Sequence, residues 1–337
     1  MEVVNKVHEH NLVAWAKDRP NVMVLSGDLT GSTEISLFKQ TYPDRFISMG
    51  MAEQNMLSWA GGLAREGFVP FLHTFAVFLY RRPLDQLQMS VCYPNLPVRL
   101  VGFLPGVSTP GGVTHQAIED LSVLRGVPNL TILEVGDATD VESVLDLTDD
   151  IAGPVYLRML RGQVPRLFPE SGRLQLNRAR VLSVGSDIAL LSTGLCTEQA
   201  LRVTGLLSKR GVSVSHLHIT TIKPFSDPTV RSALARAKHG VITMENHSVI
   251  GGLGTCTAEL MAEAGIGKPL LRVGIKDTYC QGASLPYLMR KHGLDALGLV
   301  GAVEKLLNTN LAISEADLEG TRVEQAVPLG VEQLEAL

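Results

Sequence analysis

The sequence predicts an α/β protein of two domains, each a mostly parallel sheet flanked by helices. Two observations lead to this fold class. Short runs rich in Val, Ile and Leu alternate with helical segments, and the same alternation restarts after a stretch interrupted by prolines and a glycine. Parallel strands covered by helices on both faces have this apolar character. A chain of 337 residues with 45% hydrophobic content is long enough to form two such cores.

The first domain is expected over residues 1–165. Its predicted strands are short and rich in Val, Ile and Leu, and helical stretches separate them. The strands are predicted at 21–25, 45–48, 68–72, 98–103, 130–135 and 155–159, and the helices at 53–65, 84–92, 117–124 and 138–147.

A linker is expected over residues 166–182, because prolines and a glycine interrupt this part of the chain and no periodicity is visible. The second, smaller domain is expected over 183–310. Residues 311–337 are polar and acidic with weak periodicity, and we expect a tail that is disordered or wrapped around a partner. In the second domain, strands are predicted at 187–191, 212–217, 241–244 and 270–273, and helices at 197–210, 255–264 and 297–307.

Composition excludes several classes of function. The formal net charge of −4 provides no basic field for nucleic acid. No apolar run approaches the roughly 18 residues of a membrane span, and the acidic N-terminus does not resemble a signal peptide. Without a C-x-x-C pair, neither a zinc site nor a disulfide framework is indicated, so we expect reduced thiols and a cytoplasmic protein. The cysteines are Cys92, Cys196, Cys256 and Cys280.

Four short blocks carry a family resemblance. Residues 48–56 place Glu53 at the start of a helix that follows a strand, and 73–78 read His-Thr-Phe-Ala-Val-Phe. The glycine-rich block 106–116 ends in Thr-His-Gln, and 153–161 ends in an arginine. With these blocks, residues 1–310 resemble the C-terminal half of transketolase, which is a pyrimidine-binding domain followed by the transketolase C-terminal domain. The Gly-Asp-Gly motif of the diphosphate site has no counterpart, so the chain resembles one subunit of a split transketolase.

The resemblance implies a role for each of five residues. Glu53 would be catalytic and would bind the aminopyrimidine of thiamine diphosphate, because a carboxyl at the far ring nitrogen drives the tautomerisation that activates this cofactor. Phe75 and Phe78 would pack against the same ring. His115 would be a second catalytic residue that contacts substrate hydroxyls, and Arg161 would bind the substrate phosphate.

Each of these residues also has an ordinary structural interpretation. Glu53 could simply favour the positive end of a helix dipole. Phe75 and Phe78 could be core residues, and His115 could cap or turn the chain before a helix at 117. Arg161 could be a surface ion-pair partner.

The sequence departs from the family at two positions. Phe103 replaces a phosphate-contacting histidine, and Gly111 replaces an aspartate. What takes over these contacts is not evident from the sequence. In the second domain, the run Gly252-x-Gly254 lags its strand and lacks a third glycine, so it does not indicate NAD binding. We interpret those glycines as structural, because they permit close helix–strand packing.

The resemblance implies the C-terminal subunit of a thiamine-diphosphate-dependent transketolase, which transfers a two-carbon ketol unit from a ketose phosphate to an aldose phosphate. The subunit would be active only with an N-terminal partner that carries the diphosphate and Mg²⁺ site, in an α2β2 heterotetramer. Alternatives are the β-subunit of a 2-oxo acid dehydrogenase E1 component, a deoxyxylulose-phosphate synthase-like enzyme, and a non-enzymatic assembly module. The donor and acceptor sugars depend on a few contacts and are not set by the sequence.

Overall fold

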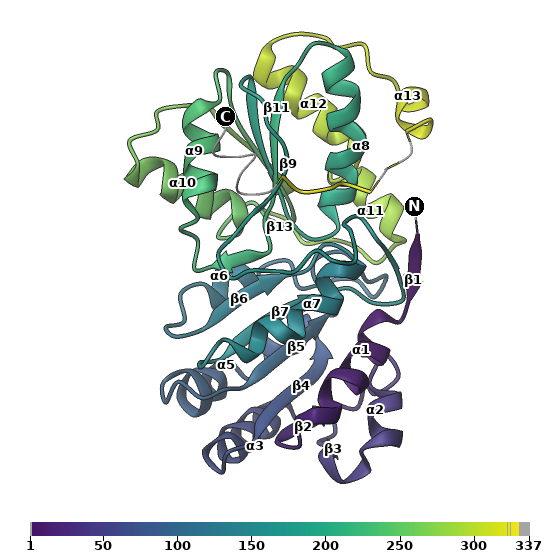
Figure 1. The fold of residues 1–337 in the computed structure, drawn as a ribbon, viewed down its shortest axis with the longest axis vertical. Helices are drawn as coiled ribbons and strands as arrows, with labels where there is room; N and C mark the ends of the chain where they lie inside the picture. The colour runs from purple at the N-terminus through teal and green to yellow at the C-terminus, as the bar shows by residue number, and fades with distance from the viewer. Residues whose placement is uncertain (1, 322, 324, 330–337) are drawn as a thin grey trace.

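The computed structural model describes residues 2–321, 323 and 325–329 and contains two stacked α/β domains (Figure 1). The first domain holds a seven-stranded sheet in the order β12-β6-β7-β5-β4-β2-β3, in which only the pairing of β12 with β6 is antiparallel. This confirms the predicted fold class of two mostly parallel sheets flanked by helices. The strands are β2 (Val22–Ser26), β3 (Phe46–Ser48), β4 (Val69–Phe75), β5 (Arg99–Phe103), β6 (Thr131–Glu134), β7 (Val155–Met159) and β12 (Thr221–Lys223).

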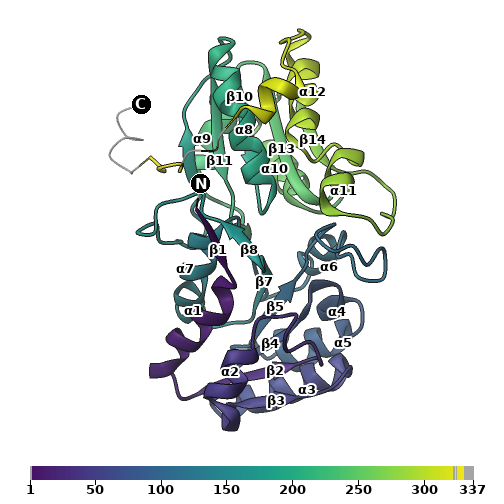
Figure 2. The same ribbon diagram turned by 90° about the vertical axis from the view of Figure 1, so that its right-hand side faces the viewer.

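Helices cover both faces of this sheet (Figure 2). α1 (Val7–Trp15) and α7 (Ala138–Asp149) pack on one face, whereas α3 (Glu53–Arg65) and α4 (Ala76–Tyr80) pack on the other. The predicted helix at 53–65 is confirmed, because its apolar side chains are spaced to bury one face against the sheet. The remaining helices of this domain are α2 (Ser36–Thr41), α5 (Leu84–Gln86) and α6 (Asp120–Leu124), with 3₁₀ turns at Ala16–Asp18 and Pro43–Arg45.

Two helix predictions differ from the structure. The segment 84–92 is not one α-helix, because α5 is followed by a π-helical turn over Leu87–Cys92. There α3 passes so close that a Cβ on Gly61 would collide with the backbone carbonyl of Ser90. The helix expected from 117 begins only at Asp120, since Ala117 forms β-bridges with Pro105 and Gly106.

The second domain has a five-stranded sheet in the order β14-β13-β10-β11-β9, with only β9 antiparallel to its neighbour. α8 and α12 contact each other on one face, and α9 and α10 contact each other on the other face (Figure 1). The strands are β9 (Arg180–Ser183), β10 (Ile188–Ser192), β11 (Val214–His218), β13 (Gly240–Ser248) and β14 (Leu270–Ile275), and the helices are α8 (Cys196–Lys209), α9 (Pro228–Arg236), α10 (Leu253–Glu263), α11 (Leu285–Lys291) and α12 (Ala296–Leu307).

The glycines of the 252–254 run have the structural role expected for them. Glu245 accepts hydrogen bonds from the backbone N–H groups of Leu253 (2.6 Å) and Gly254 (2.8 Å) at the start of α10. A Cβ on Gly252 would overlap the Glu245 carboxylate, and a Cβ on Gly254 would lie 2.6 Å from Cδ of Arg272. Side chains larger than hydrogen are therefore excluded at both positions.

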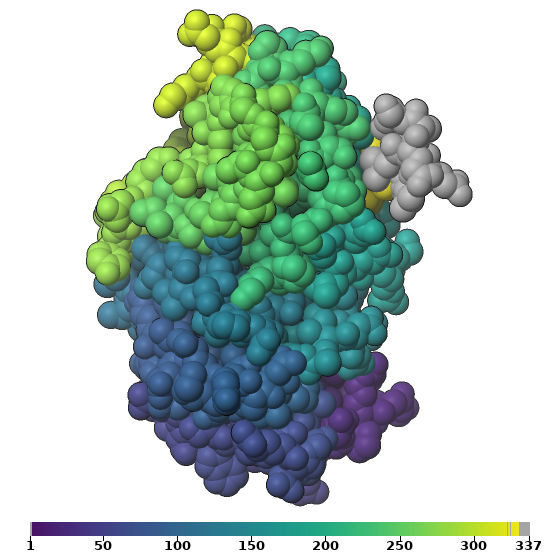
Figure 3. Space-filling model, turned by 90° about the vertical axis from the view of Figure 1, so that its left-hand side faces the viewer, coloured from purple at the N-terminus to yellow at the C-terminus, as the bar shows by residue number. Residues whose placement is uncertain are grey.

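The two domains share a continuous boundary, which Figure 3 shows as the green and yellow second domain resting on the blue first domain. Strand β12 lies in the second half of the sequence yet belongs to the sheet of the first domain. At the boundary the buried Arg158 pairs with Asp120 (2.9 Å) and Glu134 (2.5 Å) and donates to the carbonyl of Asn246 (3.1 Å). Removing one partner of such a buried ion pair typically costs about 3–5 kcal/mol, so the pairs hold Arg158 in place within the first domain. The second domain is joined to this cluster by the Asn246 carbonyl and by the hydroxyl of Thr193, which donates to Glu134 at 3.0 Å.

The predicted linker and the described part of the tail contribute buried residues to the fold, which we did not expect from their sequence. Leu167 and Phe168 are buried, and β9 begins inside the predicted linker at 180. A two-stranded ribbon joins β1 (Val3–Asn5) to β8 (Gln163–Pro165), directly before that linker. The chain limits predicted for each domain stay a prediction.

In the tail, α13 (Glu315–Glu319) begins with a capping box at Ser314, and further on Ala326 bonds to the carbonyl of Leu167. The described part of the tail is therefore not disordered, because scattered apolar side chains (Leu311, Ile313 and Leu318) fill the second core. The tail prediction for 330–337 lies outside the described residues. Within the described part of the chain, no helix has the length and apolar character needed to cross a bilayer.

Candidate active site

Glu53 lies where the carboxyl ends of the parallel strands meet. It is the first residue of α3 and is only 2% exposed, although glutamate is rarely buried unless it has a partner. Two features of neighbouring strand ends explain how the carboxylate fits there. Gly27 follows β2, and a Cβ at that position would lie 3.2 Å from Cβ of Thr74 and 3.7 Å from Oε1 of Glu53. The Oγ1 of Thr74 is buried without a hydrogen-bond partner among the described residues.

Three rings gather beside this carboxylate. The rings of Phe75, at the end of β4, and Phe78, in α4, are stacked with centroids 6.0 Å apart and an interplanar angle of 26°. The imidazole of His115 meets both rings edge-on, at 6.1 Å from Phe75 and 5.6 Å from Phe78. The sequence separation between these residues gives no hint of this contact, which arises because the 106–116 loop folds back over α4.

Arg82 joins the carboxylate to the rings. Its Nη1 donates to Oε1 of Glu53 at 2.7 Å, and its guanidinium carbon lies 3.9 Å from the centroid of Phe78. A flat, nitrogen-rich group that donates an N–H to Glu53 and stacks on Phe78 is therefore accommodated. The aminopyrimidine of thiamine diphosphate is also a flat, nitrogen-rich group, so the residues present fit the cofactor that the resemblance implies.

Gly111 allows His115 to take up its position. A Cβ on Gly111 would lie 2.9 Å from Cγ of the imidazole, which is closer than real side chains approach. The imidazole Nδ1 is 2.9 Å from Oγ1 of Thr114. The space of the aspartate side chain expected from the family is thus partly filled by the histidine ring itself.

Phe103 does not face the site. It is fully buried and packs against His8 and His73, whose ring centroids lie 5.4 and 6.3 Å from its own. Burial lowers the pKa of His8 to about 3 and also lowers that of His73, so both imidazoles are neutral at ordinary pH. These enclosed histidines are not available as substitutes for a substrate-contacting histidine.

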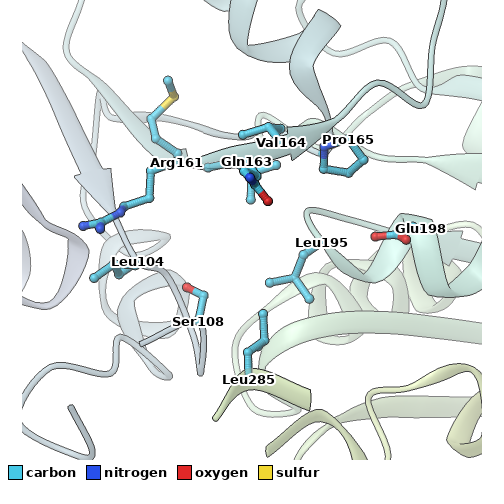
Figure 4. A pocket seen from close by; sticks show the side chains of 12 residues that line it. Leu104, Ser108, Arg161, Gln163, Val164, Pro165, Leu195, Glu198 and Leu285 are labelled. Atoms are coloured by element: carbon cyan, nitrogen blue, oxygen red, sulfur yellow. The ribbon is translucent and has the colours of Figure 1, made fainter. Parts of the chain in front are cut away.

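Arg161 makes its contacts outside the Glu53 cluster. It is exposed, and its Nη1 donates to the carbonyl of Ser32 at 2.7 Å. It lines a pocket of about 240 Å³ between the domains, where Arg161 and Glu198 stand on opposite sides with Leu195 between them (Figure 4). Burial raises the pKa of Glu198. The pocket lining does not include Glu53 or His115.

The structure thus brings Phe75, Phe78 and His115 into contact, links Phe78 to Glu53 through Arg82, and places Arg161 in the pocket between the domains, whose lining includes none of these residues. The roles of these residues stay predictions. Sequence reasoning missed Arg82, which the pair Arg-Arg after the aromatic block could have signalled. Within residues 2–321, 323 and 325–329, no group of three or more His, Cys, Asp or Glu side chains is arranged to hold a metal ion.

Comparison with protein families gives two matches that together span most of the chain. The transketolase pyrimidine binding domain matches residues 3–166, and the transketolase C-terminal domain matches residues 177–298. Both matches agree with the two sheets described above.

Two transketolase-type relatives match over almost their whole length, whereas the deoxyxylulose-phosphate synthases match over about half of theirs. A putative uncharacterized transketolase family protein of Sinorhizobium fredii is 38% identical, over 89% of this chain and 87% of the relative. A 6-deoxy-6-sulfo-D-fructose transketolase subunit of a Clostridium species is 36% identical, over 88% of this chain and 91% of the relative. Deoxyxylulose-phosphate synthases, such as that of Geobacter sulfurreducens at 30% identity, match over only 47% of their own length.

Among solved structures, a split gene transketolase described as an inactive beta4 tetramer superposes with a TM-score of 0.82. It is 33% identical, and the match covers 91% of this chain and 99% of that one. Since both transketolase domains match this chain and its relatives include a split gene transketolase, the chain belongs to the transketolase family, with a thiamine-dependent function of the transketolase type.

Proposed function

We propose that the chain is the C-terminal subunit of a thiamine-diphosphate-dependent transketolase, which moves a two-carbon ketol unit from a ketose phosphate to an aldose phosphate. One observation carries the proposal. The carboxylate of Glu53 is almost completely buried and accepts a hydrogen bond from the flat guanidinium of Arg82, which stacks on Phe78.

In this proposal, the residues of the chain orient the cofactor ring and exchange protons with the cofactor and the substrate. Glu53, Phe75 and Phe78 would hold thiamine diphosphate, which would supply a nucleophilic carbon and an electron sink for the sugar carbonyl. Glu53 holds a proton between its carboxyl and the far nitrogen of the aminopyrimidine, and its burial excludes water from that exchange. Phe75 and Phe78 fix the plane of the ring, and His115 exchanges a proton with substrate hydroxyls close to the reacting carbon.

Arg161 is proposed to bind the anionic end of the substrate. A guanidinium can bond a tetrahedral anion with two parallel N–H groups, which suits phosphate. The relative named as a 6-deoxy-6-sulfo-D-fructose transketolase subunit has a sugar with a sulfonate at that end, so related chains need not share one anion. The class of substrate that we propose for this site is therefore a sugar with a terminal anion.

A partner subunit of the N-terminal transketolase type is proposed to supply the diphosphate and Mg²⁺ site. Exposed apolar side chains near Glu53, including Met51 (78% exposed) and Trp59 (51%), support a large contact there. We propose an α2β2 heterotetramer, because two-fold symmetry creates two equivalent cofactor sites, and light scattering on the co-expressed pair would reveal it. Four free, buried cysteines support a cytoplasmic setting.

The experiment that tests the proposal replaces Glu53 by Gln in the reconstituted complex. An amide cannot exchange the proton, so turnover should fall by about 100-fold or more while the fold is retained. Glu66→Gln is the matched control, because Glu66 ends the same helix but is exposed. Turnover of the Glu53 variant within a few-fold of the parent would refute the proposal.

The substrate distinguishes the alternatives. A ketose phosphate cleaved in the presence of an aldose phosphate supports a transketolase. Consumption of pyruvate, with transfer either to a lipoyl group or to a triose phosphate, would instead indicate the 2-oxo acid dehydrogenase or the deoxyxylulose-phosphate synthase type.

A further inference from the structure

The loop that carries His115 has little regular structure of its own. Between β5 and α6, residues 104–119 form only isolated bridges, and Gly106 and Gly112 have positive φ angles of 61° and 71°. Such a loop is not rigid by itself. If the imidazole is to act with defined geometry, contacts from elsewhere must hold the loop.

Arg81 makes these contacts from the side of α4. Its Nη1 donates to the carbonyl of Val113 at 2.9 Å and its Nη2 to the carbonyl of Gln116 at 3.3 Å. These two carbonyls flank Thr114 and His115. The guanidinium is itself oriented by Glu119, whose Oε1 accepts from Nε at 2.7 Å, and by the hydroxyl of Tyr80 at 3.0 Å. Three of the five N–H groups of the guanidinium therefore bond this loop or its supports.

The second domain holds the opposite side of the same loop. The buried side chain of Gln116 donates to the carbonyl of Gln281 at 3.2 Å. The loop approaches Gly282 so closely that a Cβ on Gly282 would lie 2.9 Å from the carbonyl oxygen of Pro110, and a Cβ on Gly112 would lie 3.2 Å from the backbone nitrogen of Gly282. The loop is thus held between Arg81 and the second domain, and Arg81 is its main polar contact on the α4 side.

We propose that Arg81 is a positioning residue for His115. By fixing the two carbonyls on either side of the Thr114–His115 pair, it holds the imidazole edge-on against Phe75 and Phe78. Its neighbour Arg82 contacts Glu53 instead, so two adjacent arginines serve two different parts of the site. The catalytic consequence rests on the proposed function of His115, whereas the structural consequence does not.

The structural consequence is tested on the full chain with ¹³C-labelled histidine, whose ring signals are shifted by the neighbouring aromatic rings. The His115 signal is assigned from its loss in His115→Gln. Arg81→Ala should move it toward the position of an exposed histidine. Arg81→Lys should do the same while retaining a positive charge, because an ammonium cannot bridge two carbonyls as a fork does. If the alanine variant does not fold, the lysine variant carries the test.

Arg125→Ala is the matched control. Arg125 also bonds a loop carbonyl, that of Gly251 at 3.0 Å, and pairs with Glu259, but it does not contact the His115 loop. Its removal should leave the His115 signal in place. An unchanged His115 signal in the Arg81 variants, or an equal shift in the control, would overturn the proposal.

A double-mutant cycle in the reconstituted complex tests the catalytic consequence. Displacing a catalytic group by about 1 Å can cost about 100-fold, so Arg81→Ala should lower kcat/KM by about that factor. In a His115→Ala background, Arg81→Ala should lower kcat/KM only about threefold or less, because the imidazole that Arg81 positions is already absent. Equal losses in both backgrounds would overturn a role through His115. If the parent complex has no transketolase activity, the proposed function fails, and the histidine signal still decides the role of Arg81.

Discussion

Removing Arg82 should strengthen the binding of thiamine diphosphate to the assembled enzyme. In the structure, the guanidinium of Arg82 bonds Glu53 and covers Phe78, which are the two groups proposed to hold the aminopyrimidine. Cofactor and arginine then compete for the same contacts. Arg82→Ala removes the competing guanidinium and leaves the Glu53 carboxylate and the aromatic rings in place.

The size of the effect follows from these contacts. A hydrogen bond to a charged group contributes about 1.5–3 kcal/mol, and the lower value applies because the Arg82 side chain is 43% exposed. Stacking on Phe78 adds about 0.5 kcal/mol at such an exposed site. The sum of about 2 kcal/mol corresponds to roughly 30-fold tighter binding. The variant should also be less stable in the absence of cofactor, because Glu53 is then buried without its partner.

Calorimetric titration of thiamine diphosphate into the reconstituted complex measures the change. Arg45→Ala is the matched control, because Arg45 also stacks on an aromatic ring, that of Tyr42 at 3.9 Å, but does not contact Glu53. Unchanged cofactor binding by the Arg82 variant would refute the competition, and weaker binding would in addition show that the arginine assists the cofactor.

Three further predictions concern other parts of the molecule. Arg161→Ala should raise KM about 100-fold more for phosphorylated sugars than for unphosphorylated ones, as expected for a lost charged hydrogen bond, and equal losses would remove Arg161 from the anion site. Gly111→Ala should lower kcat about tenfold or more by pushing the active-site imidazole aside, whereas Gly62→Ala, which has open space around it, should not. Because burial lowers the pKa of His8 to about 3, the unfolded chain binds a proton below pH 6.5 that the folded chain does not, so stability is full above pH 6.5 and falls below it. Between pH 6.5 and 5 this amounts to about 2 kcal/mol, so denaturant titrations should show a flatter pH dependence for His8→Asn than for the parent chain.

Local signals in the sequence were sufficient for the elements that present the candidate site. The helix predicted at 53–65 is observed with these limits, because its apolar spacing and its partner strand lie close together in the sequence. The aromatic block was also placed correctly at the end of a strand, although β4 continues to Phe75 rather than ending at residue 72. Parallel strand ends converge at one edge of a sheet, so the gathering of these groups follows from the fold class.

Contacts between segments that are far apart in the sequence could not be predicted from local signals. Arg81 and Arg82 are neighbours in the sequence, but each finds its partner about 30 residues away, in Val113 and in Glu53. No local pattern encodes which of two adjacent arginines turns toward which partner. The strand at 221–223 was missed for the same reason, because only its edge position beside β6 makes so short a segment a strand.

That edge position limits how the molecule can be divided. A protein cut after residue 166, where the pyrimidine-binding match ends, would lose β12 and leave the backbone of β6 open along Thr131–Glu134. Ile132 and Leu133, which are fully buried in the whole chain, lie on that strand. An uncovered, apolar edge strand pairs readily with other chains, so the truncated half should aggregate rather than fold alone. The short strand thus protects the first half of the chain from self-association, and genetic separation of the two halves would have to replace it.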